Sequence, residues 1–115
     1  MSMKIEKIAF GNIQIDGCVF DGSADLIIYW DKIEKVEKSH QKTIKDFEKI
    51  MIKEPEIVIF GTGFNDIVKI DEKIDNLAKK ESVKILKMPT PEALKKFSEL
   101  TRKGNRVAAL VHTTC

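Results

Sequence analysis

Residues 55–63 read Pro-Glu-Ile-Val-Ile-Phe-Gly-Thr-Gly. Within them, the run Glu56–Phe60 is largely apolar and β-branched, which is typical of a strand that is buried on both faces of a sheet. Pro55 ends the preceding helical pattern, because a proline disfavours helical geometry in the residue before it. The turn Gly61-Thr62-Gly63 closes the strand. These residues therefore predict the centre of a helix-covered sheet.

Helical patterns lie on both sides of this strand. Residues 43–54 carry apolar side chains at helical spacing, and Thr43 followed by Asp46 has the pattern of a capping box. Residues 71–80 show the same spacing after the strand. We expect a third helix to begin at Thr90 as its N-cap, with a proline in its first turn, and to end before the following glycine.

Further strands alternate with these helices. The apolar runs within Val83–Lys87 and Arg106–Val111 predict two of them. Because crossovers between parallel strands are right-handed, the strands at 56–60 and 83–87 should run in parallel, with their carboxyl ends on one edge of the sheet. The direction of the last strand is left open by the pattern.

The first 30 residues have a different pattern of short strands. Asp16-Gly17 is a hairpin signal, since glycine tolerates positive φ, and Cys18–Phe20 is the predicted return strand. Ala24–Trp30 predicts a mostly buried strand, and the charged stretch 31–42 predicts a solvated loop. Together, the patterns predict an α/β (α+β) domain over residues 1–115, with an N-terminal β-layer on a mixed sheet and about three helices.

The composition excludes several classes of protein. The 115 residues are the usual size of one domain, and 20 Lys plus Arg against 18 Asp plus Glu leave a net charge of only +2, which argues against a dedicated nucleic-acid binder. The apolar runs are too short to span a bilayer, and we see no signal peptide. Two cysteines without a CxxC pattern do not suggest a disulfide framework. We therefore expect a cytoplasmic protein that binds neither membrane nor nucleic acid and has no cofactor.

An ordered set of short motifs runs nearly end to end along the chain. They are Trp30-Asp31, His40, Pro55-Glu56, Gly61-Thr62-Gly63, Thr90, Lys96-Phe97-Ser98, Gly104, Arg106-Val107 and the ending His112-Thr113-Thr114-Cys115. This set resembles the Mth-domain family, and the ending is most similar to its adipogenesis-associated branch. The chain departs from the family pattern at Ser98, where an Asn is common, and in a thinner glycine-rich opening.

The resemblance implies a fold and a class of role. The fold is a β-layer on a mixed α/β sheet. The role is that of an assembly or regulatory partner, as in the family members that assist assembly of the mitochondrial NADH dehydrogenase, and no catalytic activity is implied. We therefore expect a protein-interaction module that binds protein partners or, as a homodimer, itself. The alternative is a small enzyme that binds a small molecule or an anion.

The candidate binding residues for that alternative are Gly61, Thr62, Gly63, Thr90 and Arg106. A glycine turn after a buried strand and a helix start both present free N–H groups, which attract anions, and arginine adds a bidentate fork. The turn is not a dinucleotide or phosphate-loop fingerprint, since Asp66 takes the third glycine position. The competing interpretation is a tight turn and a plain helix cap.

Two other groups of residues are candidates for function. His112 and Cys115, with His40 nearby, could form a thiol–imidazole pair or part of a zinc site, although a structural zinc site needs four ligands and we predict no metal. Tyr29 and Trp30 end a strand and could anchor a partner. Because strand side chains alternate, one of the two should point into the core.

Overall fold

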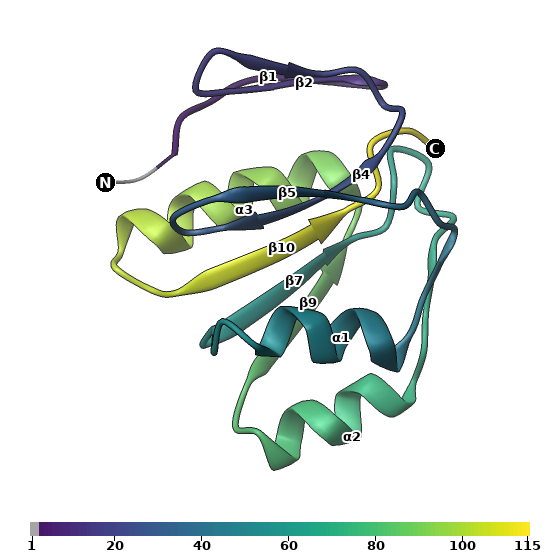
Figure 1. The fold of residues 1–115 in the computed structure, drawn as a ribbon, viewed down its shortest axis with the longest axis vertical. Coiled ribbons are helices and arrows are strands. Elements are labelled where there is room, and N and C mark those ends of the chain that lie inside the picture. Colours follow the sequence, from purple (N-terminus) through teal and green to yellow (C-terminus); the bar gives the residue numbers. More distant parts are fainter. Residues whose placement is uncertain (1–2) are drawn as a thin grey trace.

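Five strands form the central sheet of the structure, a computed structural model that describes residues 3–115 (Figure 1). They are β4 (Asp25–Tyr29), β5 (Ile33–Val36), β7 (Ile57–Gly61), β9 (Lys84–Met88) and β10 (Val107–Val111). Their order in space is β5-β4-β10-β7-β9. β10 is parallel to β7 and antiparallel to β4, and β7 is parallel to β9. The predicted parallel arrangement of the strands at 56–60 and 83–87, which are β7 and β9, is confirmed.

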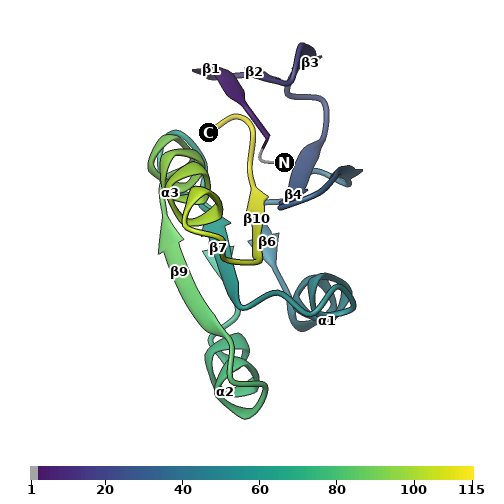
Figure 2. The ribbon, with the colours of Figure 1, turned by 90° about the vertical axis from the view of Figure 1, so that its left-hand side faces the viewer.

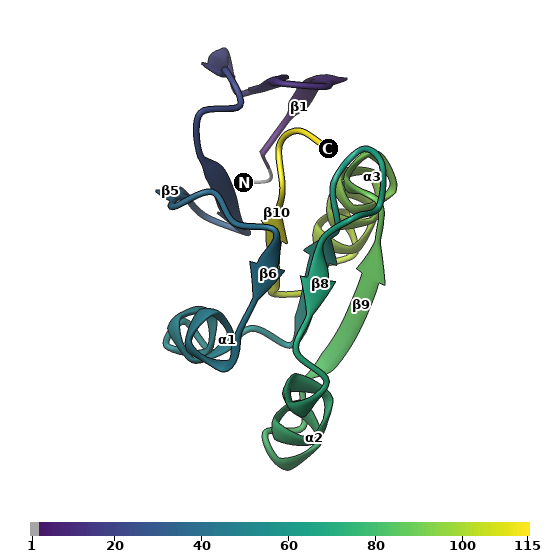
Figure 3. The ribbon, with the colours of Figure 1, turned by 90° about the vertical axis from the view of Figure 1, so that its right-hand side faces the viewer.

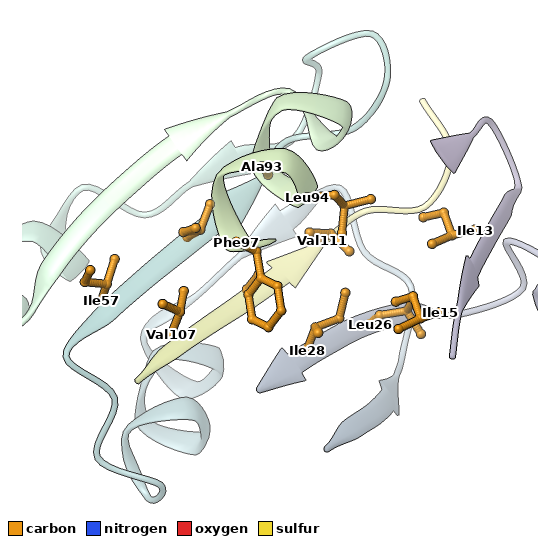
Figure 4. Packing of buried hydrophobic residues seen from close by; sticks show 12 residues of the cluster. Ile13, Ile15, Leu26, Ile28, Ile57, Ala93, Leu94, Phe97, Val107 and Val111 are labelled. Carbon is orange, nitrogen blue, oxygen red and sulfur yellow. The ribbon is translucent and has the colours of Figure 1, made fainter. Parts of the chain in front are cut away.

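The apolar alternation along the central strands builds two cores, one on each face of the sheet. On β10, Val107, Ala109 and Val111 point to one face, while Ala108 and Leu110 point to the other. β4 and β7 divide their residues in the same way. Figure 4 shows the first of these cores, in which Phe97 from the third helix lies over the sheet. Strands buried on both faces explain the nearly continuous apolar runs of the sequence.

Three helices cover the sheet. They are α1 (Ile44–Met51), α2 (Lys73–Lys80) and α3 (Thr90–Arg102). α1 and α2 pack on one face, through residues such as Phe47 and Ile74, and α3 packs on the other (Figure 2). Phe47, Phe97 and the strand residues Phe60 and Leu110 are at most 2% exposed. No helix within residues 3–115 is long and apolar enough to cross a membrane.

A small antiparallel sheet forms the predicted N-terminal β-layer. It consists of β1 (Ile5–Ala9), β2 (Asn12–Ile15) and β3 (Cys18–Phe20). Ile13 and Ile15 of β2 are fully buried in the core that α3 also covers. The predicted hairpin is confirmed, with Asp16 and Gly17 both at positive φ. The fold class is therefore the predicted mixed α/β fold with a β-layer and three helices.

The prediction of a solvated loop for residues 31–42 was wrong. β5 lies within this stretch as an edge strand, and it is followed by the two-residue strand β6 (Gln41–Lys42). β6 pairs in parallel with β8 (Lys69–Ile70), a second short strand that the sequence does not signal (Figure 3). Mixed charges are common on edge strands, because one strand side faces solvent and charge discourages further pairing.

The two predicted helix caps have different outcomes. Thr43 is the N-cap of α1, and its backbone N–H donates to the Asp46 carboxylate at 2.8 Å, as in a capping box. Thr90 is instead the first helical residue of α3, and Pro89 holds the N-cap position. The Thr90 side chain is fully buried and bonds outside its own helix, so the prediction that it caps α3 was wrong.

Candidate functional site at the carboxyl edge of the sheet

The predicted glycine turn and the start of α3 lie side by side at the carboxyl edge of the parallel strands. The Gly63 N–H donates to Thr90 Oγ1 at 3.0 Å, and the Thr90 N–H donates to the Gly63 carbonyl oxygen at 3.0 Å. The Thr90 hydroxyl in turn donates to the carbonyl oxygen of His112, at 2.7 Å, beyond the end of β10. One threonine therefore joins three segments that are far apart in the sequence.

The N–H groups that we expected to attract an anion are used inside the chain. The Thr62 N–H donates to the carbonyl oxygen of Met88 at 2.9 Å, and the Gly63 N–H is taken by Thr90. The Thr62 side chain is also occupied, because its hydroxyl donates to the Asp66 carboxylate. The prediction of an anion-accepting hollow at this turn was wrong, since these groups form hydrogen bonds within the chain and do not point into a hollow.

The C-terminal segment of the sequence covers the turn directly. The N–H groups of Phe64 and Asn65 donate to the carbonyl oxygens of Thr114 and Cys115, at 2.7 and 2.8 Å. A Cβ atom on Gly63 would clash with the Cys115 carbonyl carbon and oxygen. Gly63 is therefore required both by its φ of +96° and by the close approach of a second backbone.

Arg106 lies at the other edge of the sheet. Because β10 is parallel to β7, the residue before β10 is at the amino edge, where the Arg106 Nε donates to the Glu54 carbonyl oxygen at 3.2 Å. Its guanidinium also lies 3.7 Å from the Glu56 carboxylate, and both side chains are about half exposed. Arg106 cannot join a site with Gly63 and Thr90, so its predicted place in that site was wrong.

The polar centre of the carboxyl edge is Asp25, the first residue of β4. It is fully buried, and one of its oxygens lies 2.5 Å from Nζ of Lys42, which is only 2% exposed. Nδ1 of buried His112 lies 3.0 Å from the other oxygen. The N–H groups of Ser39 and Thr113 also donate to this carboxylate, at 3.1 and 3.4 Å. A buried carboxylate is tolerable only with such partners, and together they hold three chain segments in place.

Two more side chains continue this centre toward the surface. The imidazole of His40, which is exposed, packs against that of His112 with ring centroids 4.8 Å apart. Nε2 of His40 lies 3.7 Å from Sγ of Cys115. Burial lowers the pKa of His112 below its usual value, although the Asp25 carboxylate opposes this change. The structure thus brings together the three His and Cys residues that the sequence only suggested.

Sequence reasoning missed Asp25 and Lys42 at this centre. Asp25 did carry a signal, because a carboxylate at the head of the apolar run Leu26–Tyr29 must be paired if that strand is buried. Lys42 carried none, since its charge is one of many in a polar stretch and its partner is 17 residues away. The predicted aromatic anchors divide as expected for a strand end: Tyr29 is 1% exposed and belongs to the core, and Trp30 is partly exposed.

The amino edge of the sheet holds a hollow, which we call the amino-edge groove. Its volume is about 870 Å³, and it lies between the C-terminal ends of α1 and α2 and the beginnings of β7 and β10. Ile52, at the end of α1, is 80% exposed beside it. The residues lining the groove are Phe47, Glu48, Met51, Ile52, Glu54, Pro55, Glu56, Ile57, Leu77, Glu81, Ser82, Val83, Asn105 and Arg106.

A family of proteins shares this sequence over nearly its whole length. Residues 5–112 match the DUF498/DUF598 family, which is described as a protein family of unknown function. The chain belongs to this family. The matched range includes Asp25, His40, Lys42 and His112, while Cys115 lies just beyond it. The resemblance to the Mth-domain family that the motifs indicate is confirmed by the structures below.

Several solved structures of similar proteins have the same fold. A conserved hypothetical protein from Pyrococcus horikoshii OT3 is 32% identical, with a TM-score of 0.86 over 98% of this chain and 100% of its own. A protein named MT938 is 23% identical, with a TM-score of 0.78 over 99% of this chain and 100% of its own. A Mth938-like domain from Bordetella pertussis is 15% identical, with a TM-score of 0.70 over 96% of this chain and 85% of its own.

Proposed function

We propose that this member of the DUF498/DUF598 family is a cytoplasmic protein-interaction module with an assembly or regulatory role, and that it binds its partner in the amino-edge groove. The occupant that fits best is a partner segment with apolar side chains and positive charges. The observation that carries the proposal is the groove itself, which combines an apolar floor with a carboxylate rim. The resemblance to assembly factors supports the same class of role.

The apolar part of the groove supplies contact area. Met51, Pro55, Ile57 and Leu77 line it, and the large exposed side chain of Ile52 stands at its side. Burying such a side chain against a partner removes apolar area from water, which favours association by roughly 25 cal/mol per Å² before the costs of binding. An apolar side chain of the partner that inserts beside Ile52 would therefore act as an anchor.

The charges at the groove select the partner. Four glutamates, Glu48, Glu54, Glu56 and Glu81, line it against a single arginine. That arginine is already paired with Glu56, so the remaining carboxylates favour lysine or arginine side chains on the occupant. Exposed charges of this kind contribute to choice of partner and to association rate more than to affinity, and added salt weakens their effect.

Peptides test this proposal directly. Fluorescence anisotropy would measure binding of a short labelled peptide of alternating leucine and lysine, with a leucine–glutamate peptide of equal length as the comparison. We expect the basic peptide to bind and the acidic peptide not to bind. Ile52→Lys should weaken binding of the basic peptide by about tenfold or more, because it removes an apolar contact and adds a charge of the same sign as the peptide. Raising the salt concentration should weaken the remaining binding.

A matched control distinguishes the groove from the rest of the surface. Val19→Lys makes the same change of character at a residue that is 60% exposed on β3, in a different layer of the fold, and should leave peptide binding unchanged. Equal loss of peptide binding in Ile52→Lys and Val19→Lys, or equal binding of the basic and acidic peptides, would overturn the proposal. A concentration-dependent dimer in sedimentation that Ile52→Lys abolishes would place a second copy of the chain in the groove and also overturn the assignment of a basic partner.

A further inference from the structure

We infer that His40, His112 and Cys115 form a binding site for one Zn²⁺ ion at the carboxyl edge of the sheet. One possible ligand atom from each of the three side chains lies within 4.8 Å of the others. His40 comes from the segment before β6, whereas His112 and Cys115 follow β10, so the fold brings the set together. The site lies at the edge of the sheet opposite the amino-edge groove and does not depend on the proposed function.

The donor atoms match zinc. Imidazole nitrogen and thiolate sulfur are its preferred ligands, at about 2.0–2.3 Å, whereas Ca²⁺ and Mg²⁺ take oxygen ligands. Ligand atoms around a tetrahedral ion at these bond lengths are about 3.3–3.8 Å apart. Closing the set from within 4.8 Å therefore needs a movement of about 1 Å. Rotation of His40, which is exposed, and of Cys115, which is partly exposed, can supply it.

Asp25 supplies the carboxylate partner that metal-binding histidines generally have at the ring nitrogen that does not bind the metal. Its carboxylate lies 3.0 Å from Nδ1 of His112, which holds the ring in place. A metal would then bind Nε2, in place of the contact that this nitrogen makes with Thr114 Oγ1 at 3.4 Å. The same carboxylate accepts the N–H of Ser39, which fixes the backbone immediately before His40. Lys42 balances the carboxylate charge from the interior, at 2.5 Å. One buried group thus orients the His112 ring and fixes the backbone beside His40.

The geometry provides three protein ligands and leaves a fourth position open. A hollow of about 290 Å³ borders two of the three ligands, since His40 and Cys115 are part of its wall. Lys38, Ser39 and Thr114 complete the lining. Three ligands with an open position are typical of zinc that exchanges a water or another small ligand, rather than of a closed structural site.

A thiol–imidazole pair without metal would use only part of this arrangement. Sγ of Cys115 lies 3.7 Å from Nε2 of His40, which is close enough for a weak hydrogen bond. That pair gives no role to His112, whose ring lies 4.8 Å from that of His40 and is oriented by Asp25. Zinc binding accounts for all three side chains and for the carboxylate behind them.

Cobalt substitution tests the site on the full chain, reduced and free of any polyhistidine tag. Titration with Co²⁺ should give a thiolate-to-cobalt charge-transfer band and visible bands of tetrahedral intensity that saturate at one equivalent. Zn²⁺ should displace the cobalt. Cys115→Ser and His40→Gln should each raise the dissociation constant by at least about 100-fold, which exceeds the usual effect of losing a residue that only supports a ligand.

Matched controls make the outcome decisive. Cys18→Ser removes the other cysteine, which is exposed on β3, and should leave the cobalt spectrum and affinity unchanged. Neither His40 nor Cys115 is a core residue, so their variants should unfold at nearly the temperature of the parent protein, and this measurement checks that they fold. Three results would overturn the inference: no charge-transfer band, a band that persists in Cys115→Ser, or a loss of cobalt affinity in Cys18→Ser as large as that in Cys115→Ser.

Discussion

The two edges of the central sheet differ in how they use polar groups. At the carboxyl edge, Asp25, Lys42, Thr90 and His112 are all at most 2% exposed and are bonded to one another or to the backbone. At the amino edge, the pair Glu56–Arg106 is about half exposed and stands beside an open groove. The polar groups of the first edge hold segments of the chain together, whereas those of the second border an open groove.

This difference qualifies a general rule about α/β sheets. Ligands usually bind beyond the carboxyl ends of parallel strands, where turns and helix starts offer free N–H groups. Here the residues after β10 cover that edge, and their carbonyl oxygens accept the N–H groups of Phe64 and Asn65. What remains accessible at this edge is a set of side chains, His40 and Cys115, rather than a cradle of backbone groups.

Removing the buried lysine should produce the largest effect. Lys42→Met keeps the length of the side chain but leaves the Asp25 carboxylate buried without its counter-charge, which should lower the free energy of unfolding by about 3–5 kcal/mol. Urea unfolding would measure it. The double variant Asp25→Asn, Lys42→Met should recover part of the loss, because it removes both charges.

The comparable ion pair at the amino edge provides the control. Arg106→Met breaks the exposed pair with Glu56 and should change the free energy of unfolding by no more than about 1 kcal/mol. Similar losses in Lys42→Met and Arg106→Met would mean that the two edges do not differ in the way that the burial of their charges indicates.

A methyl group on Gly63 should have the second-largest effect. Gly63→Ala forces an alanine to a φ of +96° and places its Cβ against the Cys115 backbone. Gly17→Ala also meets a positive φ, of +81°, but has no atom within 4 Å of its Cβ, so it should cost only about 1–2 kcal/mol. Thermal and urea unfolding should show that Gly63→Ala lowers the free energy of unfolding by about 1–3 kcal/mol more than Gly17→Ala does, which is the usual cost of overpacking. Equal losses would mean that the segment after β10 is free to move away.

Loss of the Thr90 hydroxyl should have a smaller effect. Thr90→Ala leaves the Gly63 N–H and the His112 carbonyl oxygen without their partner inside the protein, at a cost of about 1–3 kcal/mol. Thr90→Ser retains the hydroxyl and should restore most of the stability. If serine were as unfavourable as alanine, the packing of the threonine methyl group, rather than the two hydrogen bonds, would be what stabilises this edge.

The sequence predicts the centre of this fold well because the signal there is local. The apolar runs at β4, β7 and β10 and the helical spacing of α1 to α3 each lie within a few consecutive residues, and burial on both faces of the sheet follows from them. β6 and β8 are two residues long and form only by pairing with each other, so neither contains a period that could be recognised.

The candidate site is less predictable because its partners are distant in the sequence. Asp25 and His112 are 87 residues apart, and the use of the Gly63 N–H depends on a threonine 27 residues later. The glycine turn was correctly located, but the sequence could not show that residues 112–115 return to cover it. The position of Arg106 depended on the direction of β10, which is set by its pairing with β7.

The smallest expected effect on stability lies at the amino edge and separates binding from folding. Ile52 is 80% exposed at the C-terminal end of α1, so Ile52→Lys should change the free energy of unfolding by no more than about 0.5 kcal/mol, and the positive charge suits a helix C-terminus. Ile50, two residues earlier, is fully buried, and Ile50→Ala should cost about 2–5 kcal/mol. Urea unfolding of both variants, beside the peptide assay, tests the contrast. Loss of peptide binding in an Ile52→Lys protein of unchanged stability would assign the surface to a partner. A large loss of stability would show instead that Ile52 helps to hold α1 in place, and the amino edge would then stabilise the fold in the same way as the carboxyl edge does.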